Sequence, residues 1–327
     1  MANYIRNIAI VGAGGQMGTF ITSALIAKNR FKITAVSRQG SPNTFPESVH
    51  IARVDYSKPD TLVEALKGQD ALICTMSVRA PREQPNQIVE AAAKAGVPWI
   101  IPNEWGSDGS NEQIEKDTLI GVPKRANREL IEKLGVSSWI GICCSFWYEY
   151  SLSGPGLYGF ELAKREVTFF DEGTQRITTS TWAQTARAVA EILSLPTESD
   201  DKAALTLNSY RNRYAYISSF ALTQREMFDV VKRVTGTSDV DWKIDSVPAK
   251  ERFEKSSARV AAGDRSAFGH LLYSRYFFPG ENAGWFELTK EMDNEKLGLP
   301  KEDLEEFTKE AIKLAESGYY VKQFSRG

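Results

Sequence analysis

The chain has 327 residues, which is enough for two domains or for one domain with a large insertion. Its formal net charge of −2 gives no electrostatic reason to expect nucleic acid or an anionic membrane as a partner. Three cysteines and two histidines are too few for a disulfide framework or for histidine-based metal or triad chemistry. The opening residues, MANYIRN, contain no apolar signal segment, and no later run reaches membrane-spanning length, so a cytoplasmic protein is expected.

A glycine-rich turn follows the first apolar run of the chain, with the spacing Gly12-x-x-Gly15-x-x-Gly18, and a helical pattern follows the turn. Gly12 permits a sharp turn, Gly15 leaves the backbone bare for a phosphate, and Gly18 lets the helix pack closely on the strand. The first helical residues, Gln16 and Met17, would direct free N–H groups and the positive end of the helix dipole at that anion. The pattern predicts a dinucleotide-binding loop. The alternative is a tight turn that binds nothing.

Strand and helix patterns alternate through the first 150 residues. Because the strand patterns are almost continuously apolar, they predict a parallel sheet that is covered by helices on both faces, a doubly wound α/β fold of Rossmann type. After the first strand, further strands are expected at 31–38, 49–54, 71–75, 97–101 and 138–142, and helices at 16–28, 58–66, 84–95 and 124–134.

The alternation weakens beyond residue 150, and residues 151–327 are expected to form a smaller α+β lobe that binds substrate. A returning segment at about 176–194 is expected to rejoin the first domain, which spans residues 1–150. In this half the patterns predict a hairpin made of 166–170 and 176–179, and helices at 182–193, 223–235 and 301–317.

The carboxyl end of the second strand carries Ser37 and Arg38 and no acidic residue. At this position a carboxylate binds the ribose of NAD, whereas an arginine accepts the 2′-phosphate of NADP. The sequence therefore favours NADP(H), the alternative being a solvated surface arginine. Thr75, Met76 and Ser77 end the fourth strand, where the ribose and pyrophosphate of such a cofactor pass, so they are expected to contact it.

None of the twelve tyrosines is followed by a lysine four residues later, which excludes the usual proton donor of short-chain dehydrogenases. Instead, the segment PNEWG at 102–106 follows the fifth strand, and Lys124 opens a later helix, with Arg128 one turn on. Together with the glycine loop and Arg38, these features resemble the isoflavone reductase-like branch of atypical short-chain dehydrogenases. That branch includes phenylcoumaran benzylic ether reductases and NmrA-like proteins, and the fungal NmrA-like type is the most similar. Asn103 and Trp105 depart from its serine and phenylalanine.

The resemblance implies that Lys124 lies near the nicotinamide and acts as general acid or base, and that Asn103 belongs to the cofactor site. From the residues alone, Lys124 would be a lysine on a helix surface. For the aromatic side chains after the sixth strand, core packing between the lobes is weighed above the alternative, an apolar wall for the substrate. The residues named as candidates for the substrate site are Trp105, Phe146, Trp147 and Tyr148.

Three functions are compatible with this pattern. The first is an NADPH-dependent reductase of a small aromatic or polyketide-like compound, in which Lys124 supplies the proton. The second is a regulator of the NmrA type, which binds NADP as a signal and docks on a protein partner without turnover. The third is an epimerase or dehydratase that returns the hydride to its product. Because they share a fold, the difference lies in the site.

Overall fold

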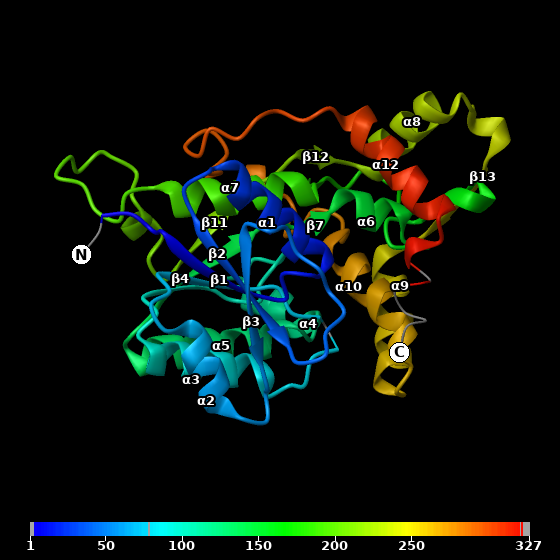
Figure 1. The fold of residues 1–327 in the computed structure, drawn as a ribbon. Coiled ribbons are helices and arrows are strands. Elements are labelled where there is room, and N and C mark those ends of the chain that lie inside the picture. Colours follow the sequence, from blue (N-terminus) through cyan, green and yellow to red (C-terminus); the bar gives the residue numbers. More distant parts are fainter. Residues whose placement is uncertain (1–2, 78, 321, 323–327) are drawn as a thin grey trace.

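The computed structural model describes residues 3–77, 79–320 and 322, and a seven-stranded sheet lies at its centre (Figure 1). The strand order is β11-β6-β5-β4-β1-β2-β3, and every neighbouring pair is parallel. The order reverses at β1, which lies between β2 and β4. The strands are β1 (Asn7–Val11), β2 (Lys32–Arg38), β3 (Val49–Val54), β4 (Ala71–Cys74), β5 (Trp99–Ile101), β6 (Ser138–Cys143) and β11 (Arg213–Tyr216).

Side chains that alternate along each strand build two cores, one on each face of the sheet. In β1, Ile8 and Ile10 belong to one buried cluster, and Ala9 and Val11 belong to the other. The first face is covered by α1 (Gln16–Ala27) and α7 (Trp182–Ser194), and the second by α2 (Pro59–Leu66), α3 (Gln84–Ala95) and α5 (Gly121–Leu134). This arrangement confirms the predicted doubly wound Rossmann-type fold.

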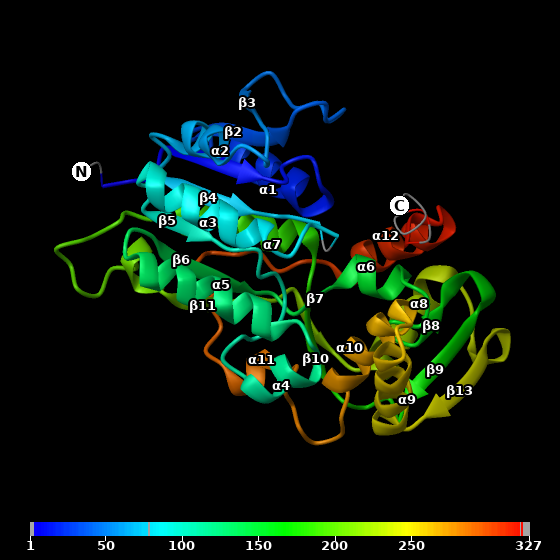
Figure 2. The same ribbon diagram turned by 90° about the horizontal axis from the view of Figure 1, so that it is seen from below.

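The rest of the chain forms a smaller α+β part beside the sheet, with β7 and α6 at the boundary (Figure 2). Two three-stranded sheets and an aromatic core, which includes Tyr158, Phe169 and Phe277, hold it together. One sheet contains β7 (Phe146–Trp147), β10 (Ile177–Ser180) and β12 (Phe220–Leu222), and the other contains β8 (Phe160–Glu161), β9 (Glu166–Phe170) and β13 (Lys243–Val247). The helices are α6 (Tyr148–Ser153), α8 (Gln224–Thr235), α9 (Ala249–Ala261), α10 (Phe268–Tyr276), α11 (Phe286–Thr289) and α12 (Leu304–Glu316).

The hairpin predicted from 166–170 and 176–179 is wrong, because the two strands belong to different sheets. β9 pairs with β8 on one edge and with β13 on the other, whereas β10 lies between β7 and β12. β9 thus pairs with the strand just before it and with the distant β13, while both partners of β10 are distant in sequence. The short polar connection between β9 and β10 carries the chain from one sheet to the other instead of closing a ladder.

Two further elements differ from the prediction. The helix expected at 124–134 begins at Gly121, and an additional short helix, α4 (Glu112–Asp117), precedes it. The seventh strand of the central sheet, β11, was not predicted, and it comes from the second half of the chain to pair with β6. Helix α7 also packs against α1. The domain division at residue 150 stays a prediction.

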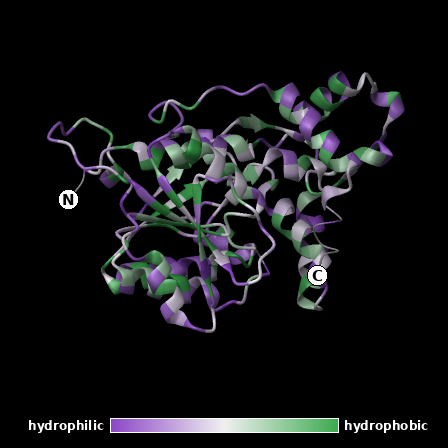
Figure 3. Cartoon of the chain, viewed as in Figure 1, coloured by the Kyte–Doolittle hydropathy of each residue, from purple (hydrophilic) through white to green (hydrophobic). Residues whose placement is uncertain are grey.

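Hydrophobic residues gather in the strands and on the inward helix faces, and polar residues lie mainly on the outer helix faces and in the loops (Figure 3). None of the helices in the described ranges combines the length and apolar character that a membrane crossing requires.

Candidate cofactor and active site

The glycine turn after β1 is built as the spacing predicts. Gly12 has φ +85°, and a Cβ at this position would lie 2.3 Å from the carbonyl oxygen of Thr75, so only glycine fits. A Cβ on Gly18 would lie 2.2 Å from the carbonyl oxygen of Gly12, which shows how closely α1 packs on the turn. Gly15 is exposed, and a Cβ there would come no nearer than 3.2 Å to Gly12. The exposed side of the turn at Gly15 is therefore where an anion can approach the backbone.

The amino end of α1 offers hydrogen-bond donors to such an anion. Among the described residues, no side chain caps this helix end, where Gly15 is the N-cap and Gln16 and Met17 are the first helical residues. Thr75, which follows β4, bonds back to Val11 through both its backbone N–H and its hydroxyl. The turn after β1 and the end of β4 thus meet at the point where the strand order reverses, the place where open α/β sheets bind ligands.

The two departures from the family pattern tie the segment after β5 to the end of β4. The Asn103 side-chain amide accepts a hydrogen bond from Met76 N–H at 3.0 Å and donates one to Met76 O at 3.2 Å. The Trp105 indole donates to the carbonyl of Cys74 at 2.9 Å. Serine cannot form both amide bonds and phenylalanine has no N–H, so these substitutions add connections between neighbouring strand ends. The predicted cofactor contacts of Asn103, Met76 and the exposed Ser77 stay predictions.

Lys124 lies in the first turns of α5, and its amine is close to groups at the carboxyl ends of two strands. Burial lowers the pKa of this amine, while the Glu104 carboxylate after β5 and the Cys143 and Cys144 thiols at the end of β6 act in the opposite direction. The charge of Arg128 adds to the lowering of the pKa. Lys124 and the PNEWG segment at 102–106 are therefore close in space.

Glu104 is the centre of a buried polar cluster. Its Oε2 accepts hydrogen bonds from Arg128 Nη1 and, at 3.3 Å, from the hydroxyl of Tyr214 on β11. Its Oε1 is buried and has no hydrogen-bond partner among the described residues. Burial raises the pKa of Glu104, and the positive charges of Arg128 and Lys124 oppose this shift. Tyr214 reaches Glu104 because β11 pairs with β6, a contact that the sequence did not reveal.

The thiols of Cys143 and Cys144 are buried and form no disulfide in the described structure. Burial raises the pKa of both, that of Cys144 to about 11. Neither thiol is activated for chemistry, because a protonated thiol is a poor nucleophile.

The four aromatic residues proposed to line the substrate site lie in different surroundings. Phe146 stacks on Tyr273, with ring centroids 4.1 Å apart, and Tyr148 is fully buried, with its hydroxyl 2.7 Å from that of Thr308. This packing favours the core alternative for both. Trp147, which is partly buried as Phe146 is, packs with the core on the α1 face of the sheet and away from that aromatic core. Trp147 and Trp105 thus remain the candidates at the carboxyl edge.

One contact at this edge comes from the far end of the chain. The Tyr319 hydroxyl, just beyond α12, donates a hydrogen bond to Gln16 Oε1 at 3.0 Å. The Tyr319 ring also packs edge-on against Trp182 at the start of α7. No local sequence signal marks this contact, because the two residues are separated by almost the whole chain.

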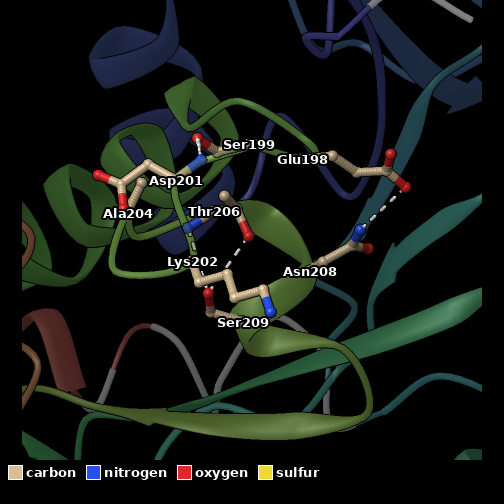
Figure 4. Close-up of a pocket in the computed structure, with 8 residues that line it drawn as sticks. All are labelled: Glu198, Ser199, Asp201, Lys202, Ala204, Thr206, Asn208 and Ser209. Carbon is tan, nitrogen blue, oxygen red and sulfur yellow. Dashed lines mark hydrogen bonds between the residues drawn. The ribbon is translucent and has the colours of Figure 1, made fainter.

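A polar surface depression at 198–209 is separate from this site (Figure 4). It is lined by residues such as Glu198, Asp201, Lys202 and Asn208, and it lies in the connection after α7. The Thr197 N–H in that connection bonds to Asn3 O, ahead of β1, so the depression is near the amino end of the sheet. Within 3–77, 79–320 and 322, no three His, Cys, Asp or Glu side chains gather as metal ligands.

The fold and this site define a Rossmann-type dinucleotide-binding protein with a lysine, in place of a tyrosine–lysine pair, at the sheet edge. The chain belongs to the NmrA-like family, whose model matches residues 5–166. It is 30% identical over 315 residues to the oxidoreductase aprR of Aspergillus flavus, covering 94% of this chain and 98% of that protein. The family match and this relative together confirm the predicted family and the oxidoreductase class.

Solved structures show the same fold at lower identity. An isoflavone reductase matches with a TM-score of 0.70 and 19% identity, covering 97% of this chain and 100% of that one. AtPrR2, solved with NADP⁺ and (+)pinoresinol, matches with a TM-score of 0.66 and 17% identity over 91% of this chain and 99% of its own.

Proposed function

We propose that this protein is an NADPH-dependent reductase of a small aromatic or polyketide-like compound, with Lys124 as the general acid. The observation that carries the proposal is that the buried Lys124 amine interacts electrostatically with Glu104 and with the thiols that end β6. These groups share a sheet edge with the glycine turn. The oxidoreductase name of the fungal relative and the NADP⁺ bound to AtPrR2 support the same reading.

The residues present fit the proposed cofactor. Gly12 and Gly15 leave a cradle that a Cβ would narrow, and the uncapped end of α1 would hold the pyrophosphate. Arg38 is exposed, and its guanidinium has neither a hydrogen bond nor an ion pair among the described residues, so this group is available to bind the 2′-phosphate. In this proposal residues 1–150 bind NADPH, and residues 151–327 supply most of the substrate lobe. When bound, NADPH supplies a hydride.

Lys124 would complete the reduction by donating a proton. Hydride addition to a carbonyl or a conjugated double bond leaves negative charge on a substrate oxygen, which an ammonium group stabilises and protonates. Because burial lowers its pKa, the ammonium is a stronger acid than an exposed lysine. The Glu104 carboxylate opposes this shift, which keeps the amine protonated to higher pH.

The test is NADPH oxidation by the purified protein, followed by absorbance, with a panel of aromatic ketones, quinones and conjugated enones. Lys124→Met is expected to lower kcat by about 100-fold or more, while the Kd for NADPH changes by less than about twofold. Lys124→Arg keeps the charge and serves as the matched variant. Unchanged turnover in Lys124→Met would remove this residue from the mechanism.

The same measurements separate the other two functions. A regulator of the NmrA type would oxidise NADPH with none of the compounds and would bind NADP⁺ and NADPH with similar affinity. An epimerase or dehydratase would convert its substrate without net consumption of NADPH.

A further inference from the structure

A second arginine stands beside Arg38 at the outer end of the sheet. In the parallel pair of β2 and β3, Ser37 is opposite Arg53 and Arg38 is opposite Val54. The Arg53 side chain reaches across to the neighbouring strand, where its Nη1 donates to Ser37 Oγ at 3.1 Å. Both arginines are exposed. By this register Arg53 shares a face of the sheet with Ser37 and Arg38 shares the other face with Val54, and the Arg53 guanidinium reaches the strand end that carries Arg38. Only Arg38 was expected there.

No carboxylate compensates this pair of charges. Neither arginine forms an ion pair with an acidic side chain in the ranges that the structure describes. The nearest acid along β3, Asp55, is engaged by Ser57, which donates to it through both its N–H and its hydroxyl, and by Lys58 at 3.6 Å. Two cations at one strand end without a counter-ion give this end a positive potential, which favours the binding of an anion.

Arg53 also fixes the turn that follows Arg38. The same Nη1 donates to the carbonyl of Arg38 at 3.3 Å and to that of Ser41 at 3.2 Å, and the Ser41 N–H bonds to Arg38 O. Nη1 therefore holds both ends of the Arg38–Ser41 turn. Its Nε and Nη2 have no partner among the described residues, so three N–H groups remain for a ligand.

The loop beyond this turn touches the glycine turn after β1. The Asn43 side chain lies so close to Gly14 that a Cβ on this glycine would be 2.2 Å from Asn43 Nδ2. A side chain at position 14 would therefore require Asn43 to move. The loop braced by Arg53 thus connects the strand end that carries Arg38 with the turn proposed to hold the pyrophosphate.

We propose that Arg53 is a second specificity-determining arginine of this protein, which binds the 2′-phosphate of the cofactor together with Arg38 and braces the Arg38–Ser41 turn through Nη1. The inference rests on the proposed use of NADPH. A 2′-phosphate carries up to two negative charges, which match two arginines better than one. Charge-assisted hydrogen bonds from both guanidinium groups would separate NADPH from NADH.

The test compares the binding of 2′,5′-ADP and 5′-AMP, which differ by the 2′-phosphate, by isothermal titration calorimetry on the full chain. Arg53→Gln is expected to weaken the binding of 2′,5′-ADP by about tenfold or more and the binding of 5′-AMP by less than about twofold. Arg53→Lys retains the charge without the planar fork, so a smaller loss, again confined to 2′,5′-ADP, is expected. Lys58→Gln removes a nearby cation that is paired with Asp55, and it should leave both affinities unchanged.

Four results would overturn the proposal. If Arg53→Gln weakens both ligands equally, Arg53 only supports the fold of the loop. If Lys58→Gln causes the same selective loss of affinity for 2′,5′-ADP, the effect comes from the general positive potential of this surface and not from a specific binding site. If the wild-type protein does not prefer 2′,5′-ADP to 5′-AMP, the proposed NADP specificity fails, and the role of Arg53 fails with it. If the wild-type protein has this preference and Arg53→Gln keeps it, only the role of Arg53 is rejected.

Discussion

The Arg128 guanidinium and the Glu104 carboxylate form a buried ion pair, with side-chain exposures of 8% and 4%. Only Oε2 of Glu104 takes part, and Oε1 has no hydrogen-bond partner in the described part of the chain. Because Glu104 is also the main group that raises the pKa of Lys124, this carboxylate links a structural ion pair to the proposed proton donor. A buried charge that keeps one oxygen unbonded is costly, which is consistent with a functional role.

The pH dependence of turnover should report this coupling. If Lys124 must be protonated, kcat/KM falls as pH rises through the pKa of its amine. Glu104→Gln removes the carboxylate that raises this pKa, while burial and the positive charge of Arg128 continue to lower it. The loss of activity should therefore begin at a lower pH than in the wild-type protein. Asp108→Asn, a change of a carboxylate paired with Lys290, is the control and should leave the profile in place. An unshifted profile in Glu104→Gln would contradict the coupling.

The amide of Asn103 should contribute measurably to stability. Asn103→Ser, which restores the residue of the family pattern, removes the two hydrogen bonds to the backbone of Met76. The expected loss is about 1–3 kcal/mol in the free energy of unfolding, measured by urea denaturation. Ser77→Ala, at an exposed position nearby, should change it by less than about 0.5 kcal/mol. Equal stabilities for the two variants would show that water replaces the amide without cost.

Glu149 should make the protein less stable as pH rises. Burial, with help from the negative charges of Glu302 and Glu310, raises its pKa to about 8 from an ordinary value of 4.5. Between these values the folded protein holds a proton that the unfolded chain releases, so the free energy of unfolding falls with rising pH. Glu149→Gln keeps the acceptor for the N–H of Trp182 and removes the titration.

The Tm of Glu149→Gln should therefore exceed that of the wild-type protein by more at pH 8 than at pH 5. Glu316→Gln, a change of an exposed carboxylate on α12, serves as the control. A Tm difference that does not depend on pH would show that Glu149 is ionised in the folded protein throughout this range.

The bond from Tyr319 to Gln16 should hold the end of α12 against α1. Tyr319→Phe keeps the ring that packs on Trp182 and removes one neutral hydrogen bond, worth about 0.5–1.5 kcal/mol. Amide hydrogen exchange at the carboxyl end of α12 should accelerate by up to about tenfold. Tyr4→Phe, a change of an exposed tyrosine, should have no effect there. Unchanged exchange in Tyr319→Phe would mean that ring packing alone holds this end.

The elements of the nucleotide-binding half could be predicted because each carries a local signal. The apolar strands and the helices between them can be recognised by their hydrophobic periodicity. The turn after β1 requires glycine at positions 12 and 18 for steric reasons that involve few residues. The second half was harder to predict. The 166–170 and 176–179 segments looked like a hairpin, because a short polar connection does not reveal which distant strands will occupy the two edges.

The sequence by itself determined the parallel Rossmann-type sheet, the glycine turn after β1, the arginine at the end of β2 and, through a family resemblance, the choice of Lys124 as a candidate. These features depend on residue type and spacing over short stretches. Only the tertiary structure decided that Arg128 and Tyr214 bond to the Glu104 carboxylate, that Arg53 bonds to the turn after Arg38, and that Tyr319 bonds to Gln16. Such contacts join segments far apart in the chain, and burial, which governs the pKa of Lys124, exists only once those segments have packed.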